Sequence, residues 1–313
     1  MNFKRTKVSF EKVNIISKKQ RIDNFLIKKF KKVPKNKIYS IIRKGRIRIN
    51  KKRVQAKYKL KIGDLIRIPP LNIYNFKRKI KINNIQKKML NNILYEDNII
   101  LIINKPSGLS VHGGSGIDYG IIESLRILRP LEKYLELIHR IDRYTSGILM
   151  IAKKKSALIY FHKQLYKKNI KKKYLALVHG RCLFKKKIVD TPLLIKNIVK
   201  KKKMVTINSI GKSSKTVFKK IKRNNLYSLI SAKPITGRTH QIRVHSKFLG
   251  HPILFDNRYG NNKLDKLFKQ KEIKKNLLLH AKKITFFHPI LKKNIIIKAP
   301  LEKNFKKIIK FLF

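Results

Sequence analysis

Apolar residues recur through this chain in short runs of two kinds. From residue 93 onward, runs of strand length such as 148–152 alternate with stretches whose apolar side chains recur at helical spacing. The helix expected at 156–169 has Ser156 as its N-cap. Its inward-facing side chains are Leu158, Phe161 and Leu165. Strands are expected in ILYEDNIILIINKP (ending at Pro106), KYLALVHG, LLLHAKKITFFHP and NIIIKAP, and a closing helix in EKNFKKIIKFLF.

Residues 21–70 form a smaller unit with its own pattern. RIDNFLIKKF predicts one helix and KNKIYSIIRKG a second, which Pro34 suits in its first turn and Gly45 ends as a cap. The inward-facing side chains of the two helices are Ile22, Phe25, Leu26, Phe30, Ile38, Ile41 and Ile42. The strand RIRIN follows, and KLKIGDLIRIPP turns at its Gly-Asp pair into another strand. The basic, weakly patterned residues 71–92 are expected to be a linker.

The charge of the chain restricts its partners. There are 80 Lys and Arg against 15 Asp and Glu, a formal net charge of +65. A globular protein this positive requires a polyanion, either nucleic acid or an anionic membrane. Lys, Ile and Asn share A- and T-rich codons and crowd the sequence, so the sign of the charge is more informative than its size. Hydrophobic residues make up 42% of the chain, which excludes a disordered basic tail.

The cysteine content and the apolar runs indicate a compartment. Cys182 is the single cysteine, so no disulfide framework and no cysteine-based metal site can form within the chain. That usage fits a reducing compartment. We find no signal peptide in MNFKRTKVSFEKV and no window of eighteen apolar residues free of charge. The expected protein is therefore soluble and cytoplasmic, with no membrane partner.

One carboxylate stands out in this basic chain. In HRIDRYTSGILMIAK, residues 139–153, Asp142 lies between two arginines in a loop that joins two expected strands. Catalytic groups usually project from such loops, and residues 145–147 would form a tight turn that holds this one fixed. Two structural interpretations compete, because Asp142 could cap an Asx-turn or pair with Arg143. Composition alone favours those two interpretations.

Several chemistries lack the residues they need. Glycoside hydrolysis requires two matched carboxylates, and no obvious second one lies near Asp142. His240 and His245 of THQIRVH are five apart, which is poor spacing for a zinc site on one helical face. Neither a Walker-type glycine loop nor a GxSxG motif occurs. What remains is one carboxylate acting on a polyanionic substrate without a metal or a nucleotide.

The unit at 21–70 has an ordered basic face. Arg46 and Arg48 alternate with Ile47 and Ile49, so the guanidinium groups are expected opposite the core face. A solvated surface explains any single lysine, but it explains the ordered pattern poorly. The residues expected to contact RNA phosphates are Lys35, Lys37, Arg43, Lys44, Arg46 and Arg48.

Four segments in this order and spacing resemble the RluA family of pseudouridine synthases: KPSGLSVHGG, HRIDRYTSGILMIAK, KKKYLALVHG and TGRTHQIRVHSKFLGHPILFDNRYG. The unit at 21–70 resembles an S4 RNA-binding domain, and the whole resemblance covers about residues 20–313. It implies an α+β fold with a mixed, largely antiparallel sheet in the catalytic domain. The expected domains are an S4-like domain with an N-terminal extension at 1–70, a linker at 71–92 and the catalytic domain at 93–313. Tyr144 departs from the family, which most often has an acidic residue there.

The resemblance implies that the protein isomerises specific uridines of 23S ribosomal RNA to pseudouridine without a cofactor. Its implied catalytic residues are Asp142, Tyr174 and Arg243, and its implied substrate-binding residues are Arg140, Leu279 and His112. Arg243 would hold the ionised Asp142 from the first turn of a helix that begins at Thr239 and stops at Gly250. Arg140 would help to extrude the target nucleotide, because a stacked base hides its glycosidic bond. His139, His245, His280 and Cys182 are expected to have structural roles.

The expected partner is 23S ribosomal RNA or an assembly intermediate of the large subunit, and the default oligomeric state is a monomer. One alternative is a related synthase that acts on other uridines of large-subunit or transfer RNA. Another is a non-catalytic RNA-binding protein that assists ribosome assembly. The joint presence of Asp142, Tyr174 and Arg243 favours an enzyme, and the S4-like unit favours a ribosomal substrate over transfer RNA.

Overall fold

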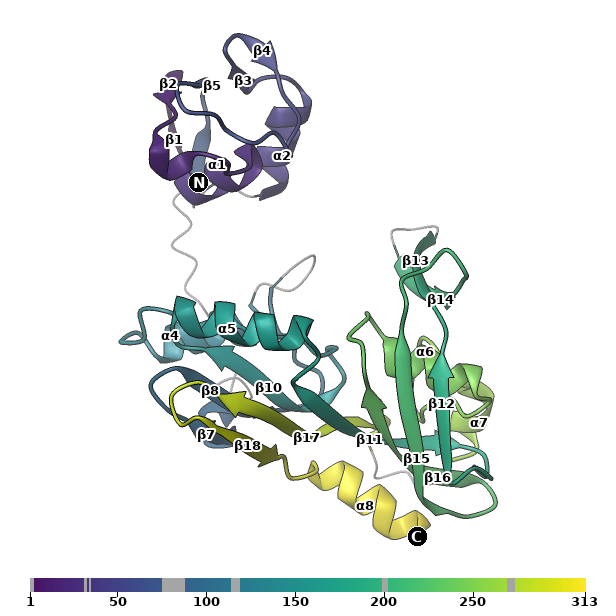
Figure 1. Ribbon diagram of the computed structural model, residues 1–313. Helices are drawn as coiled ribbons and strands as arrows, with labels where there is room; N and C mark the ends of the chain where they lie inside the picture. The colour runs from purple at the N-terminus through teal and green to yellow at the C-terminus, as the bar shows by residue number, and fades with distance from the viewer. Residues whose placement is uncertain are drawn as a thin grey trace. The chain divides into compact units, whose positions relative to one another are not determined.

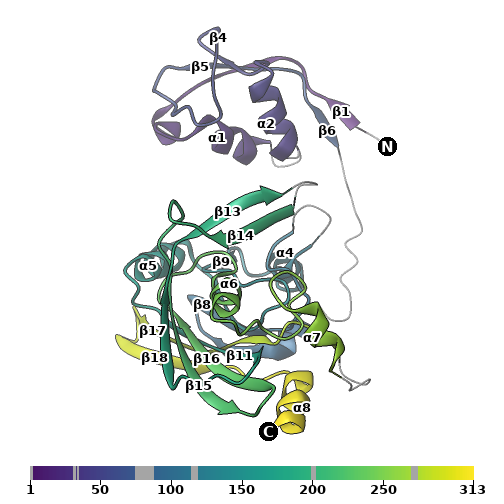
Figure 2. The ribbon, with the colours of Figure 1, turned by 90° about the vertical axis from the view of Figure 1, so that its right-hand side faces the viewer.

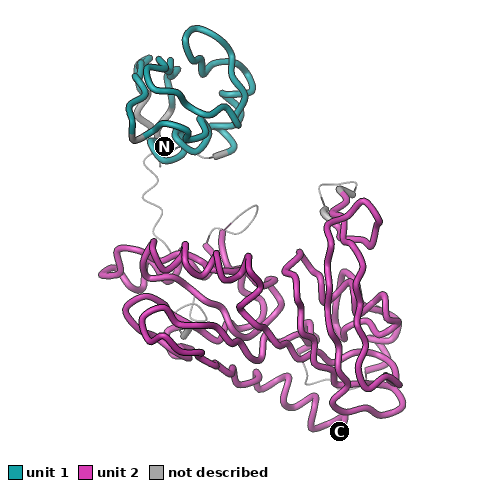
Figure 3. The backbone as a smooth tube through the Cα atoms, viewed as in Figure 1, with its two compact units in different colours: residues 1–81 teal, residues 82–313 magenta. Residues whose placement is uncertain are grey.

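A computed structural model of the chain describes residues 3–30, 33, 35–74, 88–113, 119–198, 202–268 and 274–313. The chain divides into two compact units, residues 1–81 and 82–313, each with its own hydrophobic core (Figure 3). The domain boundaries expected at 70 and 93 stay predictions, because most of the segment between them lies outside the described residues. Pro34 lies outside the described residues as well.

The first unit packs two helices against a four-stranded antiparallel sheet of order β2-β5-β3-β4 (Figure 1). A separate antiparallel ladder joins β1 to β6. The bounds are β1 Phe3–Arg5, β2 Ser9–Lys12, η1 Ile15–Ser17, α1 Ile22–Lys29, α2 Lys35–Arg43, β3 Arg48–Ile49, β4 Lys52–Arg53, β5 Leu65–Ile68 and β6 Asn72–Tyr74. Every side chain expected to face inward from the two helices is buried or partly buried in this core, which confirms their spacing.

Helix α2 ends where the sequence predicts. Gly45 has a φ of +66°, a left-handed conformation that glycine adopts without the steric cost of a Cβ. The next amide, of Arg46, donates to the carbonyl of Ile41 at 3.0 Å and closes the last turn. This cap reverses the chain directly into β3.

The second unit is built on one ten-stranded sheet of order β12-β15-β16-β11-β17-β10-β8-β7, with β18 on β17 and β9 on β10. Its strands are β7 Ile93–Glu96, β8 Ile100–Lys105, β9 Glu136–Leu137, β10 Ser146–Ala152, β11 Lys171–His179, β12 Lys186–Asp190, β15 Lys215–Arg223, β16 Tyr227–Pro234, β17 Leu279–His288 and β18 Lys293–Lys298. The other elements are η2 Lys88–Asn92, the hairpin β13 Leu193–Ile198 with β14 Lys202–Ile207, and helices α4 Ile121–Leu128, α5 Lys155–Tyr166, α6 Gln241–Phe248, α7 Asn262–Lys266 and α8 Lys303–Leu312. The sheet is mixed and largely antiparallel, which confirms the expected fold class.

Strands β8 and β10 are buried on both faces, which explains their unbroken apolar sequences. Ile102 and Met150 point into the core shared with Phe161 of α5, whereas Leu101 and Leu149 point into the core under α4. Figure 2 shows α4 and α5 on the two sides of these strands. A strand covered by helices on both faces has no polar face, so its sequence does not alternate.

The pairing of β10 with β17 is the one parallel pairing among the described strands, and it inserts a late strand beside an early one. Ala281 of β17 lies opposite Gly147 of β10 on one side and Tyr174 of β11 on the other. Gly147 has a φ of +102°, and a Cβ there would collide with the carbonyl oxygen of Ala281. The close approach therefore requires glycine, and it sets the start of β10 next to Tyr174.

Some sequence expectations about local structure are wrong. The single strand expected up to Pro106 is a hairpin of β7 and β8, because the Asp97 carboxylate accepts hydrogen bonds from the two amides after the turn, at 2.8 and 2.9 Å. Helix α5 begins at Lys155, and its N-cap is Lys154, two residues before the expected Ser156. Residues 146 and 147 belong to β10, so the turn before it runs from Asp142 to Thr145.

Candidate active site

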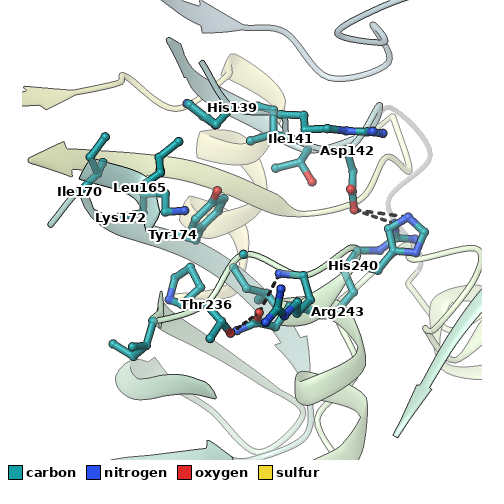
Figure 4. Close-up of a pocket in the computed structure, with 18 of the residues that line it drawn as sticks. His139, Ile141, Asp142, Leu165, Ile170, Lys172, Tyr174, Thr236, His240 and Arg243 are labelled. Carbon is teal, nitrogen blue, oxygen red and sulfur yellow. Dashed lines mark hydrogen bonds and ion pairs between the residues drawn. The ribbon is translucent and has the colours of Figure 1, made fainter. Parts of the chain in front are cut away.

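Asp142 lies in the loop between β9 and β10, as the sequence predicts (Figure 4). The amide of Thr145 donates to the Asp142 carbonyl at 3.2 Å, so this loop turns tightly into β10. Neither structural interpretation of Asp142 describes its main contact. Arg143 points away and donates from Nε to the Gly108 carbonyl at 2.9 Å, while the Asp142 carboxylate accepts from Arg243.

Arg243 bridges two carboxylates. Its Nη1 donates to Oδ2 of Asp142 at 2.9 Å, while Nε and Nη2 donate to the two oxygens of Asp256 at 2.8 and 2.7 Å. The side chain of Asp142 is 26% exposed, against 11% for Arg243 and 1% for Asp256. Although burial opposes it, the two carboxylates raise the pKa of Arg243 above its ordinary value. The guanidinium is thus a fixed cation with one accessible carboxylate in front of it.

Asp256 is a site residue that sequence reasoning missed. The expectation that no second carboxylate lies near Asp142 is wrong, because one guanidinium joins the two. Burial alone would raise the pKa of Asp256, but Arg243 and the amides of Arg258 and Tyr259 lower it, so this carboxylate stays ionised. Its oxygens are occupied by these donors, and Asp256 orients Arg243 instead of acting as an acid.

The N-terminus of α6 fixes Arg243 in the first helical turn. The N-cap is His240, with a left-handed φ of +54°, and not Thr239 as expected; Gly250 follows the helix with a φ of +77°, as expected. His240 Nδ1 lies 2.7 Å from the hydroxyl of Tyr259, whose ring carries the guanidinium of Arg243 at 5.0 Å from its centroid. Burial lowers the pKa of His240 to about 4, so this neighbour of Asp142 is neutral at pH 7.

A pocket of about 550 Å³ opens in front of Asp142. Figure 4 shows Tyr174 and Lys172 on its wall, and Leu279 of β17 contributes to the same lining. Burial and the charge of Asp142 raise the pKa of Tyr174, so the phenol stays protonated and can donate but not remove a proton. An aromatic ring, an aliphatic side chain and a carboxylate line one hollow, which suits a flat polar ring such as a nucleobase.

Arg140 and His112 lie at the rim. Arg140 is exposed and lines both this pocket and an adjoining hollow of about 760 Å³, which Asp142 and Arg243 also line. His112 is exposed and lines only the second hollow. The structure therefore brings all the residues expected at the catalytic and substrate-binding positions to one continuous surface.

A buried lysine holds the loop that carries Asp142. The ammonium of Lys105, at the end of β8, donates to three carbonyls, those of Pro106, Leu109 and Arg143, at 2.9, 3.0 and 2.9 Å. Ser107 adds a bond from its hydroxyl to the Tyr144 carbonyl at 2.7 Å. The KPSG segment contributes to the family resemblance, but its sequence does not indicate that Lys105 holds this loop.

The remaining histidines and the cysteine have structural surroundings, as expected. His139 accepts from the Met150 amide at 3.2 Å, His280 lies 2.9 Å from the Ser146 hydroxyl, and His245 is enclosed by hydroxyl groups. Burial lowers the pKa of His245 and of His280 to about 4. Cys182 is fully buried, and burial raises the pKa of its thiol.

The first unit presents the basic face that the sequence predicts. Lys37, Arg43, Lys44, Arg46 and Arg48 are all exposed, whereas the side chain of Lys35 lies outside the described residues. Two further arginines extend this face beyond the expected set. Arg48 of β3 lies opposite Arg53 of β4 on one side and opposite Arg67 of β5 on the other. Like charges directly opposite each other repel, so this row is favourable only against an anion.

The described residues contain neither a cluster of metal ligands nor a helix that could cross a membrane. None of them form a group of three His, Cys, Asp or Glu side chains that could hold a metal ion. No described helix is long and apolar enough to cross a membrane.

Comparison with known proteins places these features in a family. Residues 99–247 match the RNA pseudouridylate synthase family and residues 20–66 match the S4 domain. Two proteins named ribosomal large subunit pseudouridine synthase C, from Buchnera aphidicola subsp. Schizaphis graminum and subsp. Baizongia pistaciae, are 53% and 56% identical to the chain. The alignments cover 100% and 95% of both partners. The chain belongs to the RNA pseudouridylate synthase family. It is therefore an isomerase, an RNA pseudouridine synthase with an S4 domain.

More distant relatives agree with this assignment. A protein of the same name from Vibrio parahaemolyticus is 47% identical to the synthase over 97% of this chain and 96% of the relative. Among solved structures, human RNA pseudouridylate synthase domain containing 4 has a TM-score of 0.59 and 25% identity, covering 72% of the synthase and 95% of the human chain. The human domain containing 1 protein, at 21% identity and a TM-score of 0.56 over 74% of the synthase and 97% of its own chain, shows the same fold.

Proposed function

We propose that the synthase converts specific uridines of large-subunit ribosomal RNA, the 23S RNA, to pseudouridine. The observation that carries this proposal is similarity over the entire chain, S4 domain included, to proteins named for the ribosomal large subunit. The substrate of those relatives is thereby assigned to this chain. Its basic composition and the row of Arg48, Arg53 and Arg67 on the first unit support an RNA partner.

Asp142 is the catalytic residue in this proposal. Isomerisation breaks the bond between the ribose C1′ and N1 of uracil and forms one between C1′ and C5; C5 loses its proton and N1 gains one. Asp142 is the accessible carboxylate of the pocket, and Arg243 holds it in one orientation. Attack on the sugar, attack on the base and removal of a sugar proton all fit this placement, because each needs an ionised carboxylate beside the target nucleotide.

The other pocket residues bind the target nucleotide. Tyr174 stacks on the uracil and Leu279 packs against it, while Arg140 occupies the space in the helix that the flipped nucleotide leaves. Flipping costs a few kcal/mol, which an inserted guanidinium offsets in part. His112 contacts the RNA at the rim of the second hollow.

The S4 domain supplies a grip that does not depend on the target base. Its exposed cations, Lys35, Lys37, Arg43, Lys44, Arg46 and Arg48, contact phosphates. We propose that the synthase acts in the cytoplasm, as a monomer, on 23S RNA or on large-subunit assembly intermediates.

Mapping pseudouridines in 23S RNA from cells with and without the protein tests the substrate. We expect defined uridines to lose their modification without the protein and to regain it with wild type but not with Asp142→Asn. The Asn variant keeps the shape of the side chain and should still fold and bind RNA. Pseudouridine made by Asp142→Asn would refute the catalytic assignment, and an unchanged 23S map would refute the substrate.

A further inference from the structure

Lys172 is a lysine inside the candidate active site whose amine has no assigned role. It lies two residues before Tyr174 on β11, so both side chains are on the same face of the strand and both line the pocket. Its neighbours Lys171 and Lys173 are on the opposite face and are exposed. Lys172 is the partly buried one, and burial lowers the pKa of its ammonium.

The amine of Lys172 lacks a partner in the structure. Among the described residues it has neither a hydrogen bond nor an ion pair. A partly buried amine without a partner gives up part of its hydration and gains nothing in return. Gly237, in the loop before α6, lines the same end of the pocket, and a Cβ there would stand 3.7 Å from Lys172 Nζ. Because that position is glycine, space remains beside the amine for a ligand atom.

Lys172 and Asp142 lie toward different ends of the pocket, with Tyr174 between them (Figure 4). The charge of Asp142 raises the pKa of Tyr174, whereas the charge of Lys172 lowers the pKa of the half-buried His139. The two opposite charges make no ion pair. In uracil, the atom across the ring from N1 is C4. A base that stacks on Tyr174 with its ribose at Asp142 therefore turns its O4 toward Lys172.

We propose that Lys172 is a further catalytic residue, which donates a hydrogen bond from its amine to O4 of the target uracil. This assignment rests on the proposed function. When the C1′–N1 bond breaks, the electron pair left on the base spreads to O4, where a cation stabilises it. The same donor disfavours cytosine, because the 4-amino group of cytosine is itself a donor and would leave both groups unpaired.

The test combines a side-chain change with a change of one substrate atom. Rates are measured in single turnovers on an RNA that carries the mapped target as uridine or as 4-thiouridine, whose sulfur is a weaker acceptor. We expect Lys172→Met to slow conversion of uridine by about 10- to 100-fold, the usual worth of a hydrogen bond to a charged group. The thio substitution should slow the wild type but add little to the defect of Lys172→Met. Lys173→Met, which removes a charge from the exposed face of the same strand, should behave as wild type on both RNAs.

Two results would overturn the assignment. One is a wild type that converts 4-thiouridine as fast as uridine, a result that does not depend on how any variant folds. The other is a Lys172→Met variant in which the two penalties multiply, since independent penalties mean that Lys172 does not touch O4. Lys172→Arg, which keeps a donor, should retain the wild-type preference for uridine. If the wild type makes no pseudouridine in 23S RNA, the proposed function fails first, and the two failures are distinguished.

Discussion

At the scale of single residues, the site is organised around one guanidinium with two unlike carboxylates. Asp142 faces the pocket, whereas Asp256 is buried and fully hydrogen-bonded. Because Nε and Nη2 of Arg243 donate to Asp256, the guanidinium is fixed and its Nη1 is directed toward Asp142. Asp142 is therefore oriented by Arg243, and Asp256, whose side chain is 1% exposed, acts through that guanidinium as a positioning residue.

Replacing Asp256 tests this arrangement. Asp256→Asn keeps one acceptor oxygen but turns a donor toward Nε of Arg243, so we expect a loss of about 1–3 kcal/mol in the free energy of unfolding. Single-turnover conversion should slow about tenfold or more as Asp142 loses its fixed partner. Asp190→Asn, which removes a carboxylate from the exposed pair with Lys215, is the control and should change neither measurement. If Asp256→Asn converted RNA at the wild-type rate, the Asp256 carboxylate would not be required to position Arg243.

Sequence reasoning found the residues with a distinctive local pattern and missed those whose role is a distant contact. Asp142 could be identified from the loop that surrounds it. Asp256 and Lys105 could not, because nothing near them in the sequence shows which guanidinium or which carbonyls they meet. The sequence does not distinguish Lys172 from the lysines on either side of it. The alternation of side chains along β11 does, because it places Lys172 on the pocket face and its two neighbours on the other face.

At the scale of elements, the start of β10 fixes the position of the loop that carries Asp142. Gly147 and Ala281 form the close parallel contact that places this loop beside β11. The strands themselves could be predicted from apolar runs, whereas their order could not. The place of β17 between β10 and β11 depends on contacts between segments far apart in the sequence. The sequence of each strand does not indicate which strands lie beside it.

A single methyl group at this contact should disturb the site. Gly147→Ala combines a φ of +102° with a collision against Ala281, so we expect several kcal/mol of lost stability and little activity. Gly250→Ala is the matched control, because Gly250 has a φ of +77° but open space around it. It should cost only about 1 kcal/mol in urea unfolding. Equal losses in the two variants would show that backbone strain, and not the parallel contact, decides the outcome.

At the scale of the whole molecule, two units divide the work of recognition. The first unit has exposed arginines, among them Arg46 and Arg48, while the second unit has the pocket lined by Asp142. Charge composition alone indicated a polyanion, but not which cations face it. The ordered pattern at residues 35–48 predicts which cations face RNA, and the structure shows the side chains it describes among them to be exposed.

The salt dependence of RNA binding measures the contribution of the first unit. We expect the combined change of Lys37, Arg43, Arg46 and Arg48 to Gln to flatten the log–log plot of affinity against salt by roughly three units, because each lost phosphate contact removes nearly one. The control neutralises four other exposed lysines of the same unit. Those residues are Lys18, Lys19, Lys57 and Lys61. If both sets of substitutions reduced the slope equally, RNA binding would depend on the net charge of the unit and not on this particular face.

The strand order of the catalytic unit also bears on when activity can first arise during synthesis. Asp142 and Arg243 are 101 positions apart, and the strand that separates β10 from β11 comes later still, at Leu279–His288. A growing polypeptide that has emerged from the ribosome only as far as α6 holds both partners but not the spacer that sets their distance. Nascent chains can therefore bind RNA through their early basic segments, yet they gain chemical competence only after β17 has been made.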